Sequence, residues 1–213
     1  MADVQKRDAG RPGELSPDKR RRILDGARTL FRELGYERTS VDAIATRAGV
    51  SKATIYNHFR DKKALFLASF GAETQQLREK FHALLETPGD DIEADLRRIG
   101  EQFLRLSLSP SNIDRFRAVV ADVGRFPELG QALWECGALV GRKRFALYFE
   151  RAAARGLLEV HDPEDAATDF WSLCCADLSR QLQLGVLSRA SDELVRRHVD
   201  RAIRTFLRAY RPR

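Results

Sequence analysis

The stretch TSVDAIATRAGVSKATIYNHFRDKK, residues 39–63, is the most informative part of the chain. Apolar residues recur at helical spacing on both sides of a tight turn, where Gly49 can adopt a left-handed backbone at no steric cost. In the second helical pattern Ile55 and Phe59 share one face because they are four residues apart. The other face stays polar and cationic. This arrangement predicts a helix-turn-helix whose second helix enters the major groove of DNA.

The residue types after the turn suit different contacts with DNA. Lys52 can donate to guanine or to a phosphate, and Asn57 can pair with adenine. Ala53 and Thr54 are small enough to let the helix lie deep in the groove. Phosphate contacts are expected from hydroxyl, imidazole and ammonium groups around the two helices, namely Thr39, Ser40, Tyr56, His58 and Lys62.

The net charge of +6 lies entirely in the first third of the chain. Residues 1–66 hold 15 Lys and Arg against 9 Asp and Glu, whereas the remaining residues hold 22 of each. This distribution indicates a phosphate-binding head on a neutral body. The alternative is a basic terminal region that is merely solvated.

The helical period continues through the rest of the chain without strand-like alternation, which predicts an all-α fold. We expect a three-helix helix-turn-helix head and a body of roughly six helices. Residues 1–15 are expected to be a flexible basic arm, 16–62 the DNA-binding domain and 63–213 the effector-binding and dimerisation domain. Nine helices are predicted, over 16–35, 39–48, 51–59, 61–86, 91–108, 112–124, 128–155, 162–184 and 191–210.

Several local signals fix where these helices begin. Thr39 is expected to cap the second helix, with Asp42 completing a capping box. Ser51 and Asp61 are expected to cap the next two. The helix that starts at Asp61 is expected to continue unbroken towards Pro88 and to connect the head with the body.

The last two helices carry broad apolar faces, which predict a dimer interface. The residues expected there are Phe170, Cys174, Leu178, Val199, Ile203 and Phe206. The alternative is that both are ordinary core helices of one monomer. Aromatic residues elsewhere in the body, namely Phe103, Phe116, Trp134 and Trp171, could line an apolar ligand pocket. Plain core packing is the alternative for each of them.

Other classes of protein find little support. The three cysteines, Cys136, Cys174 and Cys175, have no metal-ligand spacing, and no nucleophile–base pair is evident, so we expect no metal, no cofactor and no enzyme. No apolar run approaches the length of a membrane span and no signal peptide is visible, so we expect a reduced, cytoplasmic protein. A redox switch at Cys174 and Cys175 is less favoured than two buried apolar side chains.

The arm contains one further candidate for DNA binding. Gly10-Arg11-Pro12 is similar to the centre of an AT-hook, and an arginine in a flexible arm could enter the minor groove. An incidental arginine in a disordered tail is the favoured alternative.

Residues 23–66, ILDGARTLFRELGYERTSVDAIATRAGVSKATIYNHFRDKKALF, resemble the DNA-binding domain of the TetR family of bacterial transcriptional regulators. The resemblance implies an all-helical homodimer, a palindromic operator and a small-molecule pocket in the body. Carried over by position, it implies base or near-base contacts by Lys52, Ala53, Thr54, Tyr56 and Asn57. It implies phosphate contacts by Thr39, Ser40, Tyr56, His58 and Lys62. The stretches RFPELGQALWECG and GLLEVHDPEDAATDFW are less specifically similar to the bodies of an AefR-like subgroup.

The expected function is therefore a DNA-binding regulator. We expect a homodimeric repressor that an unidentified, apolar small molecule releases from a palindromic operator, with no role for a membrane. The alternative is an activator or architectural DNA binder without a ligand. An enzyme that acquired the same head is a third possibility, which the missing catalytic residues disfavour.

Overall fold

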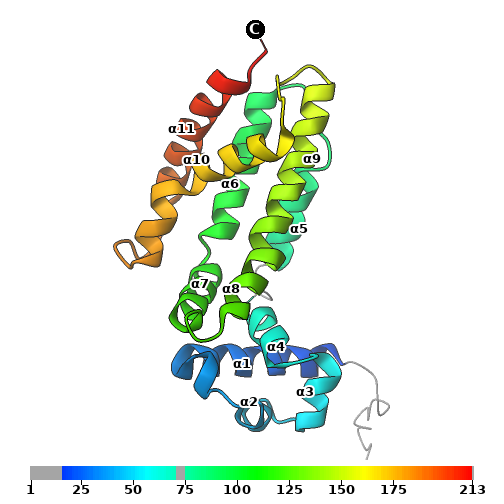
Figure 1. Cartoon of the computed structure of the whole chain (residues 1–213), viewed down its shortest axis with the longest axis vertical. Coiled ribbons are helices and arrows are strands. Elements are labelled where there is room, and N and C mark those ends of the chain that lie inside the picture. Colours follow the sequence, from blue (N-terminus) through cyan, green and yellow to red (C-terminus); the bar gives the residue numbers. More distant parts are fainter. Residues whose placement is uncertain (1–15, 71–74, 213) are drawn as a thin grey trace, which may run out of the picture. The chain divides into compact units, whose positions relative to one another are not determined.

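The computed structural model describes residues 16–70 and 75–212 (Figure 1). All regular elements within these residues are helices, so the all-α prediction is confirmed. The chain divides into two compact units, the first ending at Ser69 and the second beginning at Phe70. The arm predicted over residues 1–15, with its Gly10-Arg11-Pro12 motif, lies outside the described residues.

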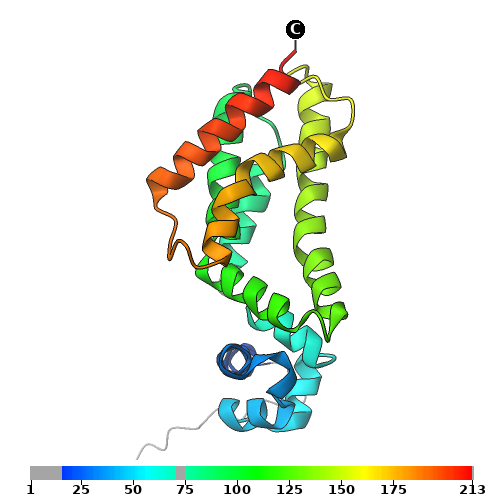
Figure 2. The ribbon, with the colours of Figure 1, turned by 60° about the vertical axis from the view of Figure 1, so that its left-hand side comes forward.

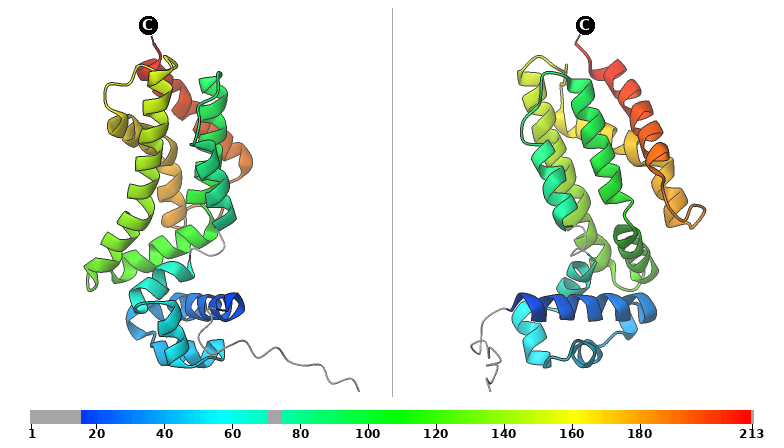
Figure 3. Two further views of the ribbon diagram at one scale, coloured as in Figure 1. Left: turned by 90° about the vertical axis from the view of Figure 1, so that its right-hand side faces the viewer. Right: turned by 180° about the vertical axis from the view of Figure 1, so that it is seen from behind.

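The first unit contains four helices. These are α1 (Pro17–Arg38), α2 (Val41–Ala48), α3 (Lys52–His58) and α4 (Lys62–Ser69). The helix α1 packs against both α2 and α4 (Figure 3). Three aromatic rings join α1 to α4, because Phe66 lies edge-on to Phe31 at 4.9 Å and to Tyr36 at 5.2 Å between ring centroids. The unit therefore includes α4, and it divides from the body later than the boundary predicted after Lys62.

Thr39 occupies a different position from the one predicted. The backbone leaves the helical conformation at Gly35, with φ of 80°, which a glycine adopts without strain. The Thr39 hydroxyl then donates to the carbonyls of Gly35 at 2.7 Å and Leu30 at 3.1 Å. Ser40 is the residue that caps α2, accepting a hydrogen bond from the Ala43 N–H at 3.0 Å. Thr39 thus anchors the end of α1, and its predicted capping role was wrong.

The second unit contains the remaining helices of the described residues. These are α5 (Gln75–Leu84), α6 (Ile92–Ser107), α7 (Pro110–Asp122), α8 (Pro127–Leu133), the π-helical segment η2 (Trp134–Leu139), α9 (Val140–Ala154), α10 (Pro163–Gln183) and α11 (Asp192–Tyr210). Caps at Asp91, Asp162 and Ser191 start α6, α10 and α11, and these are the positions at which the three helices were predicted to begin.

Two of the nine predicted helices are each divided in the described residues. The helix expected from Asp61 towards Pro88 is present as α4 and α5, with residues 71–74 outside the described part. The helix expected over 128–155 is present as α8 and α9, with η2 between them. A π-helical turn holds one extra residue without ending the helix, so apolar periodicity alone does not reveal it.

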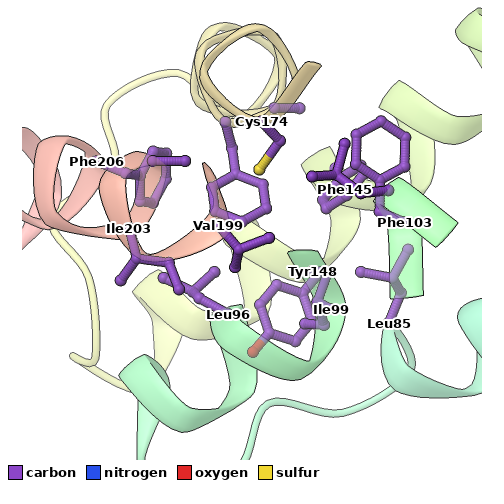
Figure 4. Close-up of a cluster of buried hydrophobic side chains, with 14 of the residues drawn as sticks. Leu85, Leu96, Ile99, Phe103, Phe145, Tyr148, Cys174, Val199, Ile203 and Phe206 are labelled. Carbon is purple, nitrogen blue, oxygen red and sulfur yellow. The ribbon is translucent and has the colours of Figure 1, made fainter. Parts of the chain in front are cut away.

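The long helices of the second unit (Figure 2) enclose one continuous apolar core, and Figure 4 shows some of its side chains. The helix α10 packs against α9 and α11, and α11 packs against α6. At the centre, the rings of Phe149, Phe170 and Phe206 lie within 5.8 Å of one another between centroids.

This core covers the residues that were predicted for the dimer interface. The six residues proposed for the interface are all buried within the chain itself, with at most 1% of each exposed: Phe170, Cys174, Leu178, Val199, Ile203 and Phe206. A side chain that its own chain covers completely is not available to a partner. This burial supports the alternative, that these six residues are ordinary core of one chain.

Candidate DNA-binding helix and body cavity

The turn between α2 and α3 is built from local signals. Gly49 ends α2 in the left-handed conformation, with φ of 64°, and the Val50 N–H donates to the Ala45 carbonyl at 3.0 Å. Ser51 then caps α3 by accepting from the Thr54 N–H at 3.1 Å. Ile55 is buried, with 1% exposed, so α3 is held in the first unit by one face.

The opposite face of α3 is exposed. Lys52, Ala53, Tyr56 and Asn57 are all solvent-accessible, and 47% of Tyr56 is exposed. Thr54 is half-buried, and its hydroxyl forms a hydrogen bond of 2.8 Å with the hydroxyl of Ser51. The structure therefore brings the predicted base-reading residues together on one accessible surface. Their contacts with DNA remain a prediction.

Lys52 already has a partner within the unit. Its Nζ atom donates to Asp42 Oδ2 at 2.9 Å, which links the start of α3 to the first turn of α2. This hydrogen bond, with the attraction between the two charges, raises the pKa of Lys52 above its ordinary value. Exposed ion pairs of this kind contribute little free energy, so Lys52 can exchange Asp42 for a phosphate or a base.

The residues predicted to contact phosphates have different environments. Ser40 is exposed, whereas Thr39 is 1% exposed and its hydroxyl donates to two carbonyls, so the structure favours Ser40 over Thr39 for the predicted phosphate contact. Lys62 lies over the Tyr36 ring at 4.4 Å and donates to a backbone carbonyl at 3.2 Å. Burial, with the charges of nearby cations, lowers the pKa of His58 below its ordinary value, which favours the neutral imidazole.

The basic surface near α3 extends to the start of α1. No residue of α1 is among the predicted DNA contacts. Lys19 and Arg20 are the cations that lower the pKa of His58. The Arg20 guanidinium also lies 5.3 Å from the centroid of the Phe59 ring, directly after α3. The run Lys19-Arg20-Arg21-Arg22 was the available signal, since four adjacent cations suit a phosphate backbone.

The second unit contains a cavity of about 660 Å³. All four residues predicted for a ligand pocket lie in its wall: Phe103, Phe116, Trp134 and Trp171. The Phe103 and Trp171 rings are 4.3 Å apart between centroids. The volume is in the range of small-molecule sites, and a wall with several aromatic side chains is typical of such sites. Ligand binding itself remains a prediction.

The π-helical segment and a glycine shape one side of this cavity. Trp134, Gly137 and Ala138 from η2 contribute to the wall. A Cβ atom at Gly141 would lie 2.7 Å from the Trp171 ring, so only glycine leaves room for that ring. The Arg142 guanidinium lies 4.7 Å from the Trp134 ring and 5.9 Å from the Trp171 ring, between the two tryptophans of the wall.

The adjacent cysteines of α10 have unreactive environments. Cys174 is fully buried in the core, and Cys175 lies in the cavity wall. Burial raises the pKa of both thiols, that of Cys175 to about 12. Because the thiolate is the reactive form, both behave as small apolar side chains at neutral pH.

Comparison with known families identifies the class of protein. Residues 23–69 match the family described as bacterial regulatory proteins of the tetR family. Residues 94–212, more than half of the chain, match the AefR-like transcriptional repressor C-terminal domain. The chain therefore belongs to the TetR family: it is a DNA-binding transcriptional regulator and not an enzyme.

Individual relatives agree with this assignment. The chain is 44% identical over 59 residues to the HTH-type transcriptional repressor Rv1474c of Mycobacterium tuberculosis. These aligned residues cover 28% of this chain and 32% of that protein. The chain spans about a third to three fifths of the length of the curated relatives it matches.

Two solved structures cover almost the whole chain. A TetR-family regulator from Mesorhizobium loti is 27% identical, with a TM-score of 0.78, covering 92% of this chain and 100% of that one. The flavonoid-responsive regulator FrrA is 32% identical, with a TM-score of 0.74, covering 93% and 100%.

Two further observations concern other kinds of site. None of the helices in residues 16–70 and 75–212 has the length and apolar character needed to cross a membrane. Within the same residues, no cluster of three or more His, Cys, Asp or Glu side chains could hold a metal ion.

Proposed function

We propose that this regulator is a homodimeric repressor that leaves a palindromic operator when a small molecule occupies the cavity of its second unit. The observation that carries the proposal is that one chain combines an exposed DNA-reading helix with a 660 Å³ aromatic cavity. Similarity to FrrA, which is named a flavonoid-responsive regulator, supports a small-molecule signal. Similarity to a named repressor supports repression. Because bacterial DNA lies in the cytoplasm, we place its action there.

The exposed side chains of α3 and of the α2 cap support two kinds of contact in the operator complex, to base edges and to phosphates. Lys52 and Asn57 carry groups that can read base edges, whereas Tyr56 and Ser40 carry hydroxyls suited to phosphates. Two copies of α3 in a two-fold dimer would read two half-sites about one turn of DNA apart. A palindromic operator follows from that symmetry.

The cavity wall supports a route from ligand to DNA. The helix α5 contributes Arg78, Phe81 and His82 to the wall, and it is the first helix of the second unit in chain order. A ligand that shifts α5 therefore acts on the part of the body closest in sequence to the head. To release DNA, the ligand must bind the released state more tightly, by a coupling free energy of about 1–3 kcal/mol.

The outward faces of α10 and α11 support a dimer better than the buried residues first considered. Exposed carboxylates gather on α10, namely Glu164, Asp165, Asp169 and Asp177. Exposed guanidinium groups gather on α11, namely Arg196, Arg197, Arg201, Arg204 and Arg208. In a two-fold dimer, α10 of one copy can face α11 of the other. The single interface then contains two symmetry-related α10–α11 contacts, and each contact pairs opposite charges.

Selection from a random DNA pool tests the operator. We expect a palindrome, with Asn57→Ala relaxing the preference at one base position per half-site by about 1–3 kcal/mol. Tyr56→Ala is the matched variant, and we expect it to weaken binding to all sequences alike. A selected site without two-fold symmetry would contradict the dimeric docking.

A thermal-shift screen followed by DNA-release measurements tests the ligand. A compound that stabilises the protein and lowers its operator affinity supports the proposal. If stabilising compounds leave operator affinity unchanged, the protein acts as a ligand-independent activator or architectural DNA binder.

A further inference from the structure

The charged part of the cavity wall is basic. Among the described residues that line the cavity, Arg78, His82 and Arg115 are basic side chains, and none is an Asp or a Glu. The helix α7 also carries Asp114 and Asp122, but neither lines the cavity. A bound anion would therefore meet the Arg78 and Arg115 guanidinium groups, and no described residue of the cavity lining would place a carboxylate against it.

One of these cations is oriented by a hydrogen-bonded neighbour. Arg115 donates to the Asn112 side-chain oxygen, and Asn112 Nδ2 donates in turn to the Ser107 carbonyl at 2.7 Å. Asn112 and Ser107 also line the cavity. A guanidinium held in this way loses less side-chain freedom when it binds a planar anion, which strengthens the contact.

Groups behind the wall add to the positive potential. Burial lowers the pKa of His82, and the charges of Arg144 and Arg78 lower it further. Arg142 acts in the same sense on Cys175, where its charge opposes the effect of burial. Cationic groups thus reach two separate residues of the wall.

The remainder of the wall suits a flat apolar body. Five aromatic residues contribute to it, namely Phe81, Phe103, Phe116, Trp134 and Trp171. The aliphatic residues Ile113, Val119 and Leu133 lie in the same wall. Aromatic walls favour planar ring systems, which gain contact area and ring–ring interactions at once.

We infer that the cavity binds an aromatic carboxylate, a ring system of two or more rings that carries one carboxylate group. The rings lie against the tryptophan and phenylalanine side, and Arg78 or Arg115 receives the carboxylate through paired N–H donors. The inference rests on the proposed function in one respect only, because it names the chemical class of the effector for that site.

Three probes of nearly equal shape test the charge preference at pH 7.5. These are biphenyl-4-carboxylate, its neutral amide biphenyl-4-carboxamide, and the cationic 4-(aminomethyl)biphenyl. Both tryptophans of the chain line the cavity, so tryptophan fluorescence reports binding there, and calorimetry checks the affinity. We expect the carboxylate to bind about tenfold or more tightly than the carboxamide, and the amine to bind most weakly.

Two variants test the source of that preference. We expect either Arg78→Gln or Arg115→Gln to reduce the ratio of carboxylate to carboxamide affinity to about threefold or less, with little change for the carboxamide. Lys80→Gln is the matched control, since Lys80 is an exposed cation of α5 that does not line the cavity. It should leave the ratio unchanged.

The outcomes separate this inference from the proposed function. Equal binding of carboxylate and carboxamide, tighter binding of the amine, or binding of none of the three overturns the inference. A preference that survives in both arginine variants also overturns it. Selective binding of the carboxylate without any release of operator DNA contradicts the proposed release mechanism and leaves the inference intact. If only neutral compounds release operator DNA, the proposed release mechanism stands and the inference of a carboxylate ligand is contradicted.

Discussion

Lys52 shows how a single residue can be prepared for a ligand while serving the free protein. Its ammonium group pairs with Asp42, and half of the side chain remains exposed. The pairing holds the start of α3 near the start of α2. The contact is exposed and therefore weak, so a phosphate or guanine can replace the carboxylate at little cost.

The Asp42→Asn variant tests this exchange. Removal of the carboxylate frees Lys52 and lowers the negative charge near DNA. We expect non-specific DNA binding at low salt to tighten by about three- to fivefold, with the slope of log affinity against log salt steeper by about one. Fluorescence anisotropy over a salt series measures both. Asp25→Asn, which breaks an exposed ion pair with Arg28 on α1, is the control; an equal effect there would rule out a specific role for Lys52.

Asp95 is the buried carboxylate that holds the loop before α6. It is 5% exposed and accepts from the Gly89 N–H at 2.5 Å, from Tyr148 Oη at 3.1 Å and from Arg98. Burial by itself would raise its pKa. The hydrogen bonds from Gly89, Arg98 and Tyr148 outweigh burial and lower the pKa below its ordinary value.

A definite pH dependence follows from that lowered pKa. The stabilisation from Asp95 is complete above the unfolded pKa of about 4 and is lost as pH falls through the folded value. We expect Asp95→Asn to lower the free energy of unfolding by about 1–3 kcal/mol at pH 7, with the difference shrinking below about pH 4. Urea unfolding at several pH values measures it. Asp90→Asn, at an exposed ion pair with Arg155, should show almost no effect at any pH.

At the scale of helices, most caps were predictable, that of α2 being the exception, and the interruptions were not. Ser51, Asp61, Asp91, Asp162 and Ser191 start their helices as their residue types indicate, because a capping hydrogen bond involves only neighbours in sequence. The π-helical segment η2 has no such local signal. Its residues Trp134, Gly137 and Ala138 line the cavity together with residues of other helices, which are distant in sequence.

The close contact between α9 and α10 gives a test at this scale. A methyl group at Gly141 would overlap the Trp171 ring, so we expect Gly141→Ala to lower the free energy of unfolding by about 1–3 kcal/mol and to alter tryptophan fluorescence. Gly137→Ala is the matched control, because a Cβ atom there meets nothing within 4 Å. An Ala gained in a helix at no steric cost should be neutral or slightly stabilising. Equal behaviour of the two variants would show that Trp171 adjusts freely.

For the whole molecule, the charge pattern of α10 and α11 makes dimerisation testable. We expect the double variant Arg201→Glu with Arg204→Glu to raise the dimer dissociation constant at least about tenfold, because like charges then meet in each α10–α11 contact of the interface. Sedimentation velocity measures the change. Lys80→Glu with Lys143→Glu alters the same total charge elsewhere on the body and should leave the dimer intact.

Mixing complementary variants gives a stricter version of this test. Asp169→Lys with Asp177→Lys should also weaken the homodimer. In a mixture with the arginine variant, both α10–α11 contacts of the heterodimer would again pair opposite charges. We therefore expect association to recover. If the mixture stays monomeric, the interface lies on another surface.

The sequence by itself determined the helical class, the helix-turn-helix and most of the caps, because these depend on residue spacing and on hydrogen bonds between near neighbours. The tertiary structure decided what each apolar face packs against. Periodicity shows that Phe170 and Val199 face inward, but whether the chain's own core or a second copy covers them depends on distant segments. For the same reason only the fold could turn Thr39 inward, gather the aromatic residues of α6, α7, η2 and α10 around one cavity, and place Arg78 and Arg115 in its wall.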